Sequence, residues 1–325
     1  MEIKSPIFCD IGITENCIFK CKMCRFWQTP KNNNELSIDE WKYFITSLKE
    51  IGGTNIRLHF SGGEPLLKEG VLDLLEFSNN IGFRTFIVTN GFLIDETIAD
   101  RIARSGIEVI TISLDSLDEN MYDFLRGTKG AYKKALQAID YLDKHGAKSI
   151  SILSVIMGLN LDYVIELAEW AERNRSISSI YFQAISQPIA TAKDRLWYEK
   201  DEFSYLWPKD KIRLDSVIAK LEDYKNKGYK ISNSKKQLEM FRAYFREPDK
   251  FGLGIQCDQG DYILYLRPTG DVLLCGYMAP IGNVRKERIK DIWYSEEASL
   301  RRKQIYSCKE SCLNVINCFV DKELP

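Results

Sequence analysis

Over residues 7–185, the pattern of apolar and polar residues switches repeatedly between strand-like runs and helix-like segments. Short apolar runs rich in β-branched residues predict strands, and segments of helical periodicity between them predict crossover helices. Capping signals support the helices, with a Ser at position 37 three residues before a Glu and a Gly at positions 106 and 146. The predicted strands are residues 7–14, 55–60, 83–89, 109–115, 149–157 and 177–185. The predicted helices between them are residues 37–51, about 69–80, 95–106, 131–146 and 161–173.

Six βα-like units in series predict a parallel sheet with right-handed crossovers. Six units are too few for a complete eight-stranded barrel. We therefore expect an α/β fold, a partial (β/α)6 TIM-like barrel, over residues 1–185. By analogy with complete barrels, functional residues should lie at the C-terminal ends of the strands.

The pattern changes after residue 185. Residues 186–250 are rich in aromatic and charged residues and contain two predicted helices, 209–228 and 234–247, so we expect a helical connecting segment that covers the substrate. Residues 251–325 form a small, cysteine-rich C-terminal domain with a predicted β-hairpin at 262–275 and a helix over roughly 288–305.

Composition narrows the function classes. The chain has 325 residues, of which 45% are hydrophobic, and a net charge of −1, which argues against a nucleic-acid partner. It has no apolar run of the roughly 18 residues that a membrane span requires. The N-terminus lacks a basic stretch followed by an apolar core, as a secretory signal would have. We therefore expect a cytoplasmic protein whose thiols stay reduced.

The nine cysteines are clustered. Cys9, Cys17, Cys21 and Cys24 lie near the start, five more lie in the last 69 residues, and none lies between. Clustered thiols in a reducing compartment are more often metal ligands than disulfides. With only two His in the chain, thiolate ligation is expected, which favours Fe–S clusters or structural zinc.

Cys17, Cys21 and Cys24 lie in the loop that follows the first predicted strand. A four-iron cluster normally takes four Cys ligands, so three thiolates leave one iron open, as catalytic metal sites leave a position for substrate. The alternatives are a zinc knuckle or unrelated buried cysteines. A zinc site would need a fourth nearby ligand, for which Cys9 is the only candidate.

This spacing of cysteines after a first strand resembles the signature of the radical S-adenosylmethionine (SAM) superfamily. In that family SAM chelates the open iron of a 4Fe–4S cluster, and its reductive cleavage gives a 5′-deoxyadenosyl radical that abstracts a substrate hydrogen. The segment Ser61-Gly62-Gly63-Glu64-Pro65, after the second strand, resembles the family's site for the methionyl amine. Residues that follow the third and fourth strands lie where members of the family contact SAM. The resemblance therefore implies eight SAM-contacting residues: Gly62, Gly63, Glu64, Thr89, Asn90, Ser113, Asp115 and Arg126.

The spacing of Cys257, Gly270 and Cys275 resembles the start of the SPASM domain and of its shorter relative, the twitch domain. A full SPASM domain has seven cysteines and two auxiliary 4Fe–4S clusters, whereas this region has five. The resemblance therefore implies one auxiliary 4Fe–4S cluster, with ligands drawn from Cys257, Cys275, Cys308, Cys312 and Cys318. A structural Cys₄ zinc site is the alternative.

The resemblance implies hydrogen abstraction from a substrate. We expect a small sugar- or nucleoside-like molecule, because a barrel that begins by residue 7 leaves no room for an N-terminal peptide-recognition domain. We also expect oxidation, because an auxiliary cluster can take up an electron. A flavodoxin- or ferredoxin-type reductant is implied.

Several alternatives remain open. The chain could be a peptide-modifying maturase, or an epimerase that uses Cys9 as its hydrogen donor, although a buried structural thiol is the simpler explanation of Cys9. An Fe–S electron carrier or a zinc-stabilised binding protein is the alternative from another class.

Overall fold

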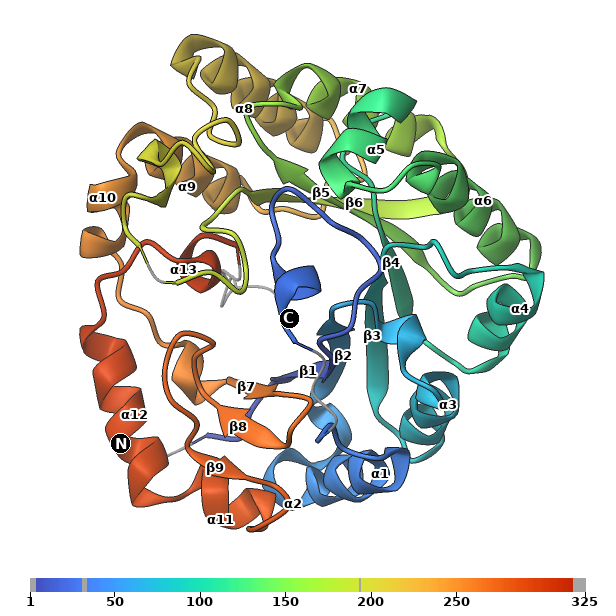
Figure 1. Cartoon of the computed structure of the whole chain (residues 1–325), viewed down its shortest axis with the longest axis vertical. Coiled ribbons are helices and arrows are strands. Elements are labelled where there is room, and N and C mark those ends of the chain that lie inside the picture. Colours follow the sequence, from blue (N-terminus) through green and yellow to red (C-terminus); the bar gives the residue numbers. More distant parts are fainter. Residues whose placement is uncertain (1–3, 31–33, 193, 318–325) are drawn as a thin grey trace.

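A computed structural model describes residues 4–30, 34–192 and 194–317. Within these residues, nine strands form one sheet in the order β6-β5-β4-β3-β2-β1-β7-β8-β9 (Figure 1). The strands are β1 (Phe8–Thr14), β2 (Arg57–Gly62), β3 (Arg84–Thr89), β4 (Val109–Ser113), β5 (Ile150–Ile156), β6 (Ile177–Ala184), β7 (Ile263–Leu266), β8 (Asp271–Leu273) and β9 (Gly282–Asn283).

Strands β1–β6 are parallel and adjacent in sequence order, which confirms the six predicted units. The helices between them surround the strands on the outer side (Figure 1). The structure therefore has the predicted partial (β/α)6 barrel. These helices are α1 (Ile38–Ser47), α2 (Lys49–Gly52), α3 (Val71–Asn80), α4 (Glu96–Arg104), α5 (Glu119–Arg126), α6 (Ala131–Lys144) and α7 (Leu161–Arg173).

Helix α5 is not among the elements that the sequence predicts, and its eight residues fall in the connection after β4. Asp118 caps its first turn by accepting a hydrogen bond from the backbone N–H of Met121, and Gly127 ends it in the left-handed conformation. The capping signals were therefore present in the sequence, but the helix is too short for a clear hydrophobic period.

The connecting segment and the C-terminal region contain α8 (Lys211–Asn226), α9 (Lys235–Arg246), α10 (Pro248–Phe251), α11 (Ile289–Trp293), α12 (Glu296–Ser307) and α13 (Leu313–Asn317). The single helix predicted over 288–305 is instead two helices, α11 and α12, because the Ser295 side chain accepts a hydrogen bond from Ala298 N–H and starts a new helix. Short 3₁₀ turns are η1 (Phe26–Gln28), η2 (Gly53–Asn55), η3 (Pro65–Leu67), η4 (Trp197–Glu199), η5 (Gly252–Gly254) and η6 (Gln259–Asp261).

Side chains alternate between the two faces of the barrel strands. On β1, Cys9, Ile11 and Ile13 are fully buried, whereas Phe8, Asp10 and Gly12, which alternate with them, are partly exposed. The same alternation holds on β2, β3 and β6. The fully buried face packs against the outer helices, and the partly exposed face lines the barrel lumen.

The C-terminal region adds to both edges of the open barrel. The predicted hairpin is present as β7 and β8, but β7 also pairs in parallel with β1 and so extends the barrel sheet. At the opposite edge, the Asn317 side chain accepts from Ala184 N–H and donates to the Ala184 carbonyl, both at 2.8 Å. The C-terminal residues therefore connect β1 to β6.

A second asparagine satisfies the free edge of β6. Asn233 accepts a hydrogen bond from Phe182 N–H at 2.7 Å and donates one to the Phe182 carbonyl at 2.8 Å. Unpaired backbone groups at a buried strand edge are costly, so these side-chain amides act in place of a neighbouring strand.

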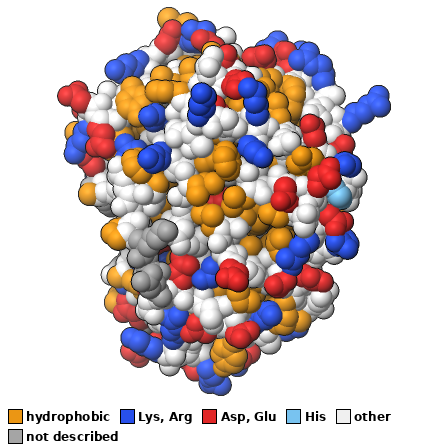
Figure 2. Space-filling view, turned by 45° about the vertical axis from the view of Figure 1, so that its right-hand side comes forward, with side chains coloured by type: hydrophobic (Ala, Val, Ile, Leu, Met, Phe, Trp, Pro, Cys, Tyr) orange, Lys and Arg blue, Asp and Glu red, His pale blue; other side chains and the backbone are white. Residues whose placement is uncertain are grey.

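The surface is mixed in charge. On the face in Figure 2, Lys and Arg side chains are interspersed with Asp and Glu, and hydrophobic side chains are exposed between them. This agrees with the net charge of −1. Every helix in the described part of the chain is too short or too polar to cross a lipid bilayer.

We predict that Asn233→Ala destabilises the fold, because it leaves the buried N–H and C=O of Phe182 without partners. The free energy of unfolding should fall by about 2–4 kcal/mol, measured by urea denaturation. The control Asn120→Ala removes an exposed amide from α5 and should leave stability nearly unchanged. Equal stability of the two variants would contradict this role of Asn233.

Candidate active site

Cys17, Cys21 and Cys24 lie in the loop that leaves the C-terminal end of β1. The loop after β2 holds the start of this segment through two backbone hydrogen bonds. Gly63 N–H donates to the Thr14 carbonyl and Glu64 N–H donates to the Asn16 carbonyl, both at 2.8 Å. The Gly-Gly-Glu motif thus fixes the direction in which the chain enters the cysteine loop.

Gly62 and Gly63 permit this contact because they have no side chain. A Cβ on Gly63 would lie 2.2 Å from the Asn16 carbonyl oxygen, and one on Gly62 would lie 2.3 Å from that of Thr14. Gly62 also has a φ of 128°, which non-glycine residues rarely adopt. Both glycines are therefore required by the local packing, whether or not they also contact SAM.

The other side of the cysteine loop rests on the C-terminal end of α5. Lys22 N–H donates to the Leu125 carbonyl at 2.8 Å. Gly127, with a φ of 61°, approaches so closely that a Cβ would lie 2.2 Å from the Lys20 carbonyl oxygen. Close approaches at glycines therefore hold the chain both just before the cysteine loop and within it.

Arg126 connects this loop to β4. Its guanidinium forms an ion pair with Asp115 at 2.7 Å and donates a hydrogen bond to the Cys21 thiol. Asp115 is fully buried and also accepts a hydrogen bond from Val155 N–H at 2.8 Å. The structure thus brings Asp115 and Arg126 together, and they direct a positive charge at one of the three thiols.

Glu64 is almost fully buried and tied to the end of β3. Its carboxylate accepts hydrogen bonds from the Thr89 hydroxyl at 2.7 Å, from Asn90 N–H at 2.8 Å and from Leu66 N–H at 3.1 Å. Burial raises the pKa of Glu64, and the bonds from Asn90 and Thr89 oppose this rise. A carboxylate has about four acceptor positions, so one remains for a ligand amine.

The remaining expected SAM contact, Ser113, is buried at the end of β4. The Tyr122 hydroxyl donates to its backbone carbonyl at 2.6 Å, which packs α5 against this strand end. All eight expected SAM-contacting residues therefore lie at or just after the C-terminal ends of β2, β3 and β4, or at the end of α5.

The three thiols are suited to a cluster. Burial raises the pKa of Cys17 to about 12 and that of Cys24 to about 11, and it also raises the pKa of Cys21. The thiols are close enough that a charge on Cys21 raises the pKa of both neighbours. Buried thiolates are costly unless a cation compensates them, and metal coordination deprotonates a thiol outright. The donor set and its burial therefore fit a bound Fe–S cluster.

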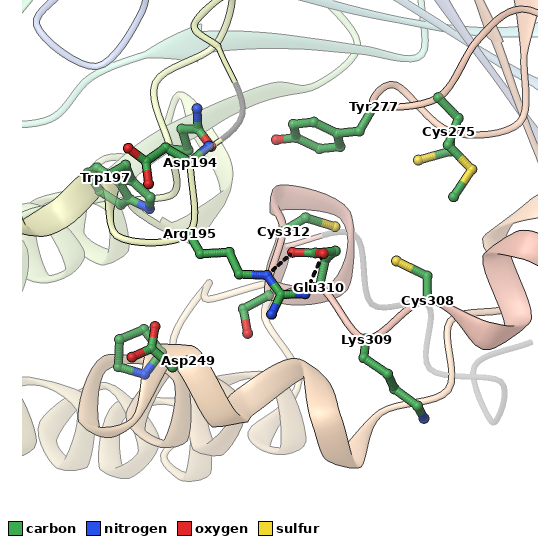
Figure 3. Close-up of a pocket in the computed structure, with 14 residues that line it drawn as sticks. Asp194, Arg195, Trp197, Asp249, Cys275, Tyr277, Cys308, Lys309, Glu310 and Cys312 are labelled. Atoms are coloured by element: carbon green, nitrogen blue, oxygen red, sulfur yellow. Dashed lines mark hydrogen bonds and ion pairs between the residues drawn. The ribbon is translucent and has the colours of Figure 1, made fainter.

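A second set of cysteines lies in the C-terminal region. Cys275, Cys308 and Cys312 line one pocket, and in Figure 3 their sulfur atoms point toward a shared space. Cys257 belongs to the same group, since charges on Cys275 and Cys308 add to the burial that raises its pKa to about 11. Cys318 lies outside the described residues.

The opposite wall of this pocket comes from the segment after β6. It includes Asp194 and Trp197, and Arg195 donates two hydrogen bonds to Glu310, at 3.0 and 2.6 Å (Figure 3). This pair connects the 186–250 segment to the residues between Cys308 and Cys312.

The described thiols of this region are those of Cys257, Cys275, Cys308 and Cys312, and four is the number of thiolates that one 4Fe–4S cluster requires.

Cys9 does not lie at the mouth of the barrel. It is fully buried on the face of β1 that packs against the outer helices, and burial raises the pKa of its thiol well above the ordinary value. Its neighbour on the opposite face, Asp10, points to the lumen and accepts a hydrogen bond from Ser61 at 2.8 Å. The placement therefore favours the structural explanation of Cys9.

Sequence reasoning missed Asp10. The only signal was its position, since it alternates with the buried Cys9 and Ile11 in an otherwise apolar strand. Burial raises the pKa of its carboxyl, and the hydrogen bond from Ser61 opposes this rise. Asp10 is thus a titratable group in the lumen, outside every motif described above.

The partial barrel and the two cysteine sites define a class of enzyme that holds Fe–S clusters at the end of a (β/α)6 sheet. Two family models agree with this. The radical SAM superfamily model matches residues 11–171, and the iron-sulfur cluster-binding domain SPASM matches residues 257–318. The chain belongs to the radical SAM superfamily and has a C-terminal SPASM domain. These two domains imply a SAM-binding 4Fe–4S cluster and an auxiliary cluster.

Relatives and solved structures support the same fold. An AdoMet-dependent heme synthase of Oleidesulfovibrio alaskensis is 26% identical over 292 residues, which are 88% of this chain and 74% of that protein. Streptococcus suis SuiB bound to S-adenosylmethionine has a TM-score of 0.72 at 18% identity, covering 94% of this chain and 68% of that one. The structure of anSMEcpe with AdoMet and the Cp18Cys peptide has a TM-score of 0.69 at 16% identity, covering 96% and 88%.

We predict that Gly127→Ala lowers iron occupancy at the first cysteine site, because the new methyl group would collide with the Lys20 carbonyl. Iron bound after anaerobic reconstitution should fall from about eight per chain toward about four. Gly130→Ala is the matched control, since Gly130 has a similar φ of 78° but no atom within 4 Å of its Cβ position. Equal iron loss in both variants would show that backbone strain, rather than the close approach, is responsible.

Proposed function

We propose that this chain is a radical SAM enzyme that oxidises a C–H bond of a small polar substrate held in the barrel lumen. When bound, SAM and its cluster supply the radical that removes a hydrogen atom, and the auxiliary cluster supplies an acceptor for the electron that the substrate then loses. Cys17, Cys21 and Cys24 would hold the first cluster. Cys257, Cys275, Cys308 and Cys312 would hold the second, with Cys318 as a further candidate.

The observation that carries this proposal is the set of polar side chains on the inner face of the sheet. Hydroxyl, amide or carboxyl groups stand there beside apolar residues such as Phe86, Val88, Leu153 and Val155. The polar lumen residues are Asp10, Ser61, Thr111, Ser151, Ser179, Tyr181 and Gln183. Such a lining provides many hydrogen-bond donors and acceptors. It supports a hydroxyl-rich substrate such as a sugar or nucleoside derivative.

Oxidation of an alcohol carbon requires a proton acceptor as well as an electron acceptor. The substrate C–H loses a hydrogen atom, the adjacent O–H loses a proton, and one electron leaves as the C=O bond forms. Asp10, a carboxylate on the lumen face of β1, would take this proton, and its raised pKa suits a general base. Ser61 holds the Asp10 carboxylate in place through its hydrogen bond.

The relatives supply a second candidate substrate. Similarity to an AdoMet-dependent heme synthase extends over 88% of the chain, which favours a tetrapyrrole as the alternative small molecule. Peptide modification is the remaining candidate, because SuiB and anSMEcpe have been solved with peptides bound. Incubation with each substrate class under anaerobic conditions, followed by mass spectrometry, discriminates among them.

We predict that the reconstituted chain, reduced with dithionite, converts SAM to 5′-deoxyadenosine. With its substrate in heavy water, the product should carry no deuterium at the reacting carbon, because oxidation removes hydrogen without returning it. Deuterium at that carbon would contradict oxidation and indicate epimerisation. Absence of 5′-deoxyadenosine from a preparation with both clusters intact would refute the proposed function.

We predict that Asp10→Asn uncouples the reaction. Product formation should fall by about 10²–10⁴-fold, the usual contribution of a general base, whereas 5′-deoxyadenosine formation should persist. The wild-type rate should fall as pH drops through the raised pKa of Asp10. Ser61→Ala removes a hydrogen bond that lowers this pKa, so it should move the fall to higher pH. Unchanged product formation in Asp10→Asn would exclude Asp10 as the base.

A further inference from the structure

Tyr244, on α9, has a buried hydroxyl that the fold does not use. The residue is 1% exposed, and its phenol oxygen forms no hydrogen bond within the described part of the chain. Tyr122, which is buried to the same extent, donates its hydroxyl hydrogen to the Ser113 carbonyl at 2.6 Å. A buried polar group without a partner is costly, so the Tyr244 hydroxyl requires another explanation.

The Tyr244 ring is held firmly beside the second cysteine set. Its centroid lies 5.3 Å from that of Trp207, against which it packs edge to face. Helix α9 also contacts α13, the short helix that directly follows Cys312. Gln237, on α9, connects the two helices because its amide donates a hydrogen bond to the Asn317 carbonyl at 3.0 Å. The phenol therefore has a fixed position next to the segment that carries Cys312.

The groups around the Tyr244 hydroxyl belong to the cysteine pocket. Burial raises the pKa of the phenol well above its ordinary value, and nearby Tyr277 and Cys312 add to this rise. Trp197 is also close, but its indole has only an N–H donor and cannot accept the phenol hydrogen. All three neighbours line the pocket toward which the cysteine sulfur atoms point (Figure 3). The acceptor that the phenol requires would therefore be a group bound in this pocket.

We propose that Tyr244 raises the reduction potential of the auxiliary cluster by donating its phenol hydrogen to the sulfur atom of Cys312. This inference rests on the auxiliary cluster of the proposed function and is independent of the substrate. Hydrogen bonds to the sulfur atoms are among the factors that set the potential of an Fe–S cluster. The reduced cluster carries one more negative charge than the oxidised cluster, so a donor stabilises it more. Tyr244 thus makes the cluster a better electron acceptor.

The test is a redox titration of the auxiliary cluster, followed by electron paramagnetic resonance. Cys17→Ala/Cys21→Ala removes the first cluster, so that the auxiliary cluster of the full chain is observed alone. In this background, Tyr244→Phe keeps the ring and removes the hydroxyl. The ratio of reduced to oxidised cluster at a fixed potential should fall about tenfold, which is a shift of about 59 mV to more negative potential.

Tyr198→Phe is the matched control. Its ring belongs to the same group of aromatic side chains, but its hydroxyl already donates to the Asp249 carboxylate at 2.7 Å. The potential should therefore remain unchanged. After exchange into heavy water, electron-nuclear double resonance of the reduced cluster should also detect a deuteron coupling that Tyr198→Phe retains and Tyr244→Phe loses.

Each result decides a different part of the inference. An unchanged potential in Tyr244→Phe with the cluster present, or an equal shift in Tyr198→Phe, would overturn the role of Tyr244 and leave the proposed function intact. A wild-type chain without iron at the second cysteine set would overturn both. If Tyr244→Phe does not retain the cluster, 3-fluorotyrosine at position 244 replaces it in the test. This more acidic phenol is a stronger donor and should raise the potential, and an unchanged potential would refute the inference.

Discussion

The rest of the site depends on the close approach of two backbone segments to residues 14–20, which lead into the cysteine loop and form its first half. Gly62 and Gly63 lie against the carbonyls of Thr14 and Asn16, and Gly127 lies against that of Lys20. A side chain at any of these glycines would collide with a carbonyl oxygen and push the loop away. The path of the chain into the cysteine loop is therefore fixed by backbone packing. Cys17, Cys21 and Cys24 would fill three corners of a 4Fe–4S cluster and leave the fourth for a ligand.

Side chains alternate between the two faces of the sheet, so one face stabilises the fold and the other faces the barrel lumen. The helix-facing side chains of β1 to β6 are largely apolar and fully buried, whereas the lumen-facing side chains include Asp10, Ser61 and Gln183. The C-terminal region completes this arrangement by pairing β7 with β1 and by placing Asn317 on the edge of β6. The second cysteine set thus belongs to the part of the chain that spans the open side of the barrel.

Much of this architecture was predictable from local patterns. The six parallel strands, the three-cysteine loop and the Gly-Gly-Glu motif each depend on residues close together in the sequence, and the structure and family models confirm the fold. The domain boundaries at 185 and 250 and the individual site residues stay predictions. What the sequence could not indicate depends on distant partners: Asp10 with Ser61, Asn233 with Phe182 and Asn317 with Ala184. No periodicity or capping signal reports such pairs, and the short helix α5, which directs Arg126 at Cys21, has too few turns to show a period.

The most direct test of this account is whether SAM occupies the open corner of the first cluster. Cys257→Ala/Cys275→Ala would leave only that cluster, which could be reduced and mixed with SAM labelled with ¹⁵N at the methionyl amine. Electron-nuclear double resonance should then detect hyperfine coupling between the cluster and the labelled nitrogen. Absence of this coupling in a cluster saturated with SAM, or a fourth side chain on the iron, would contradict the account.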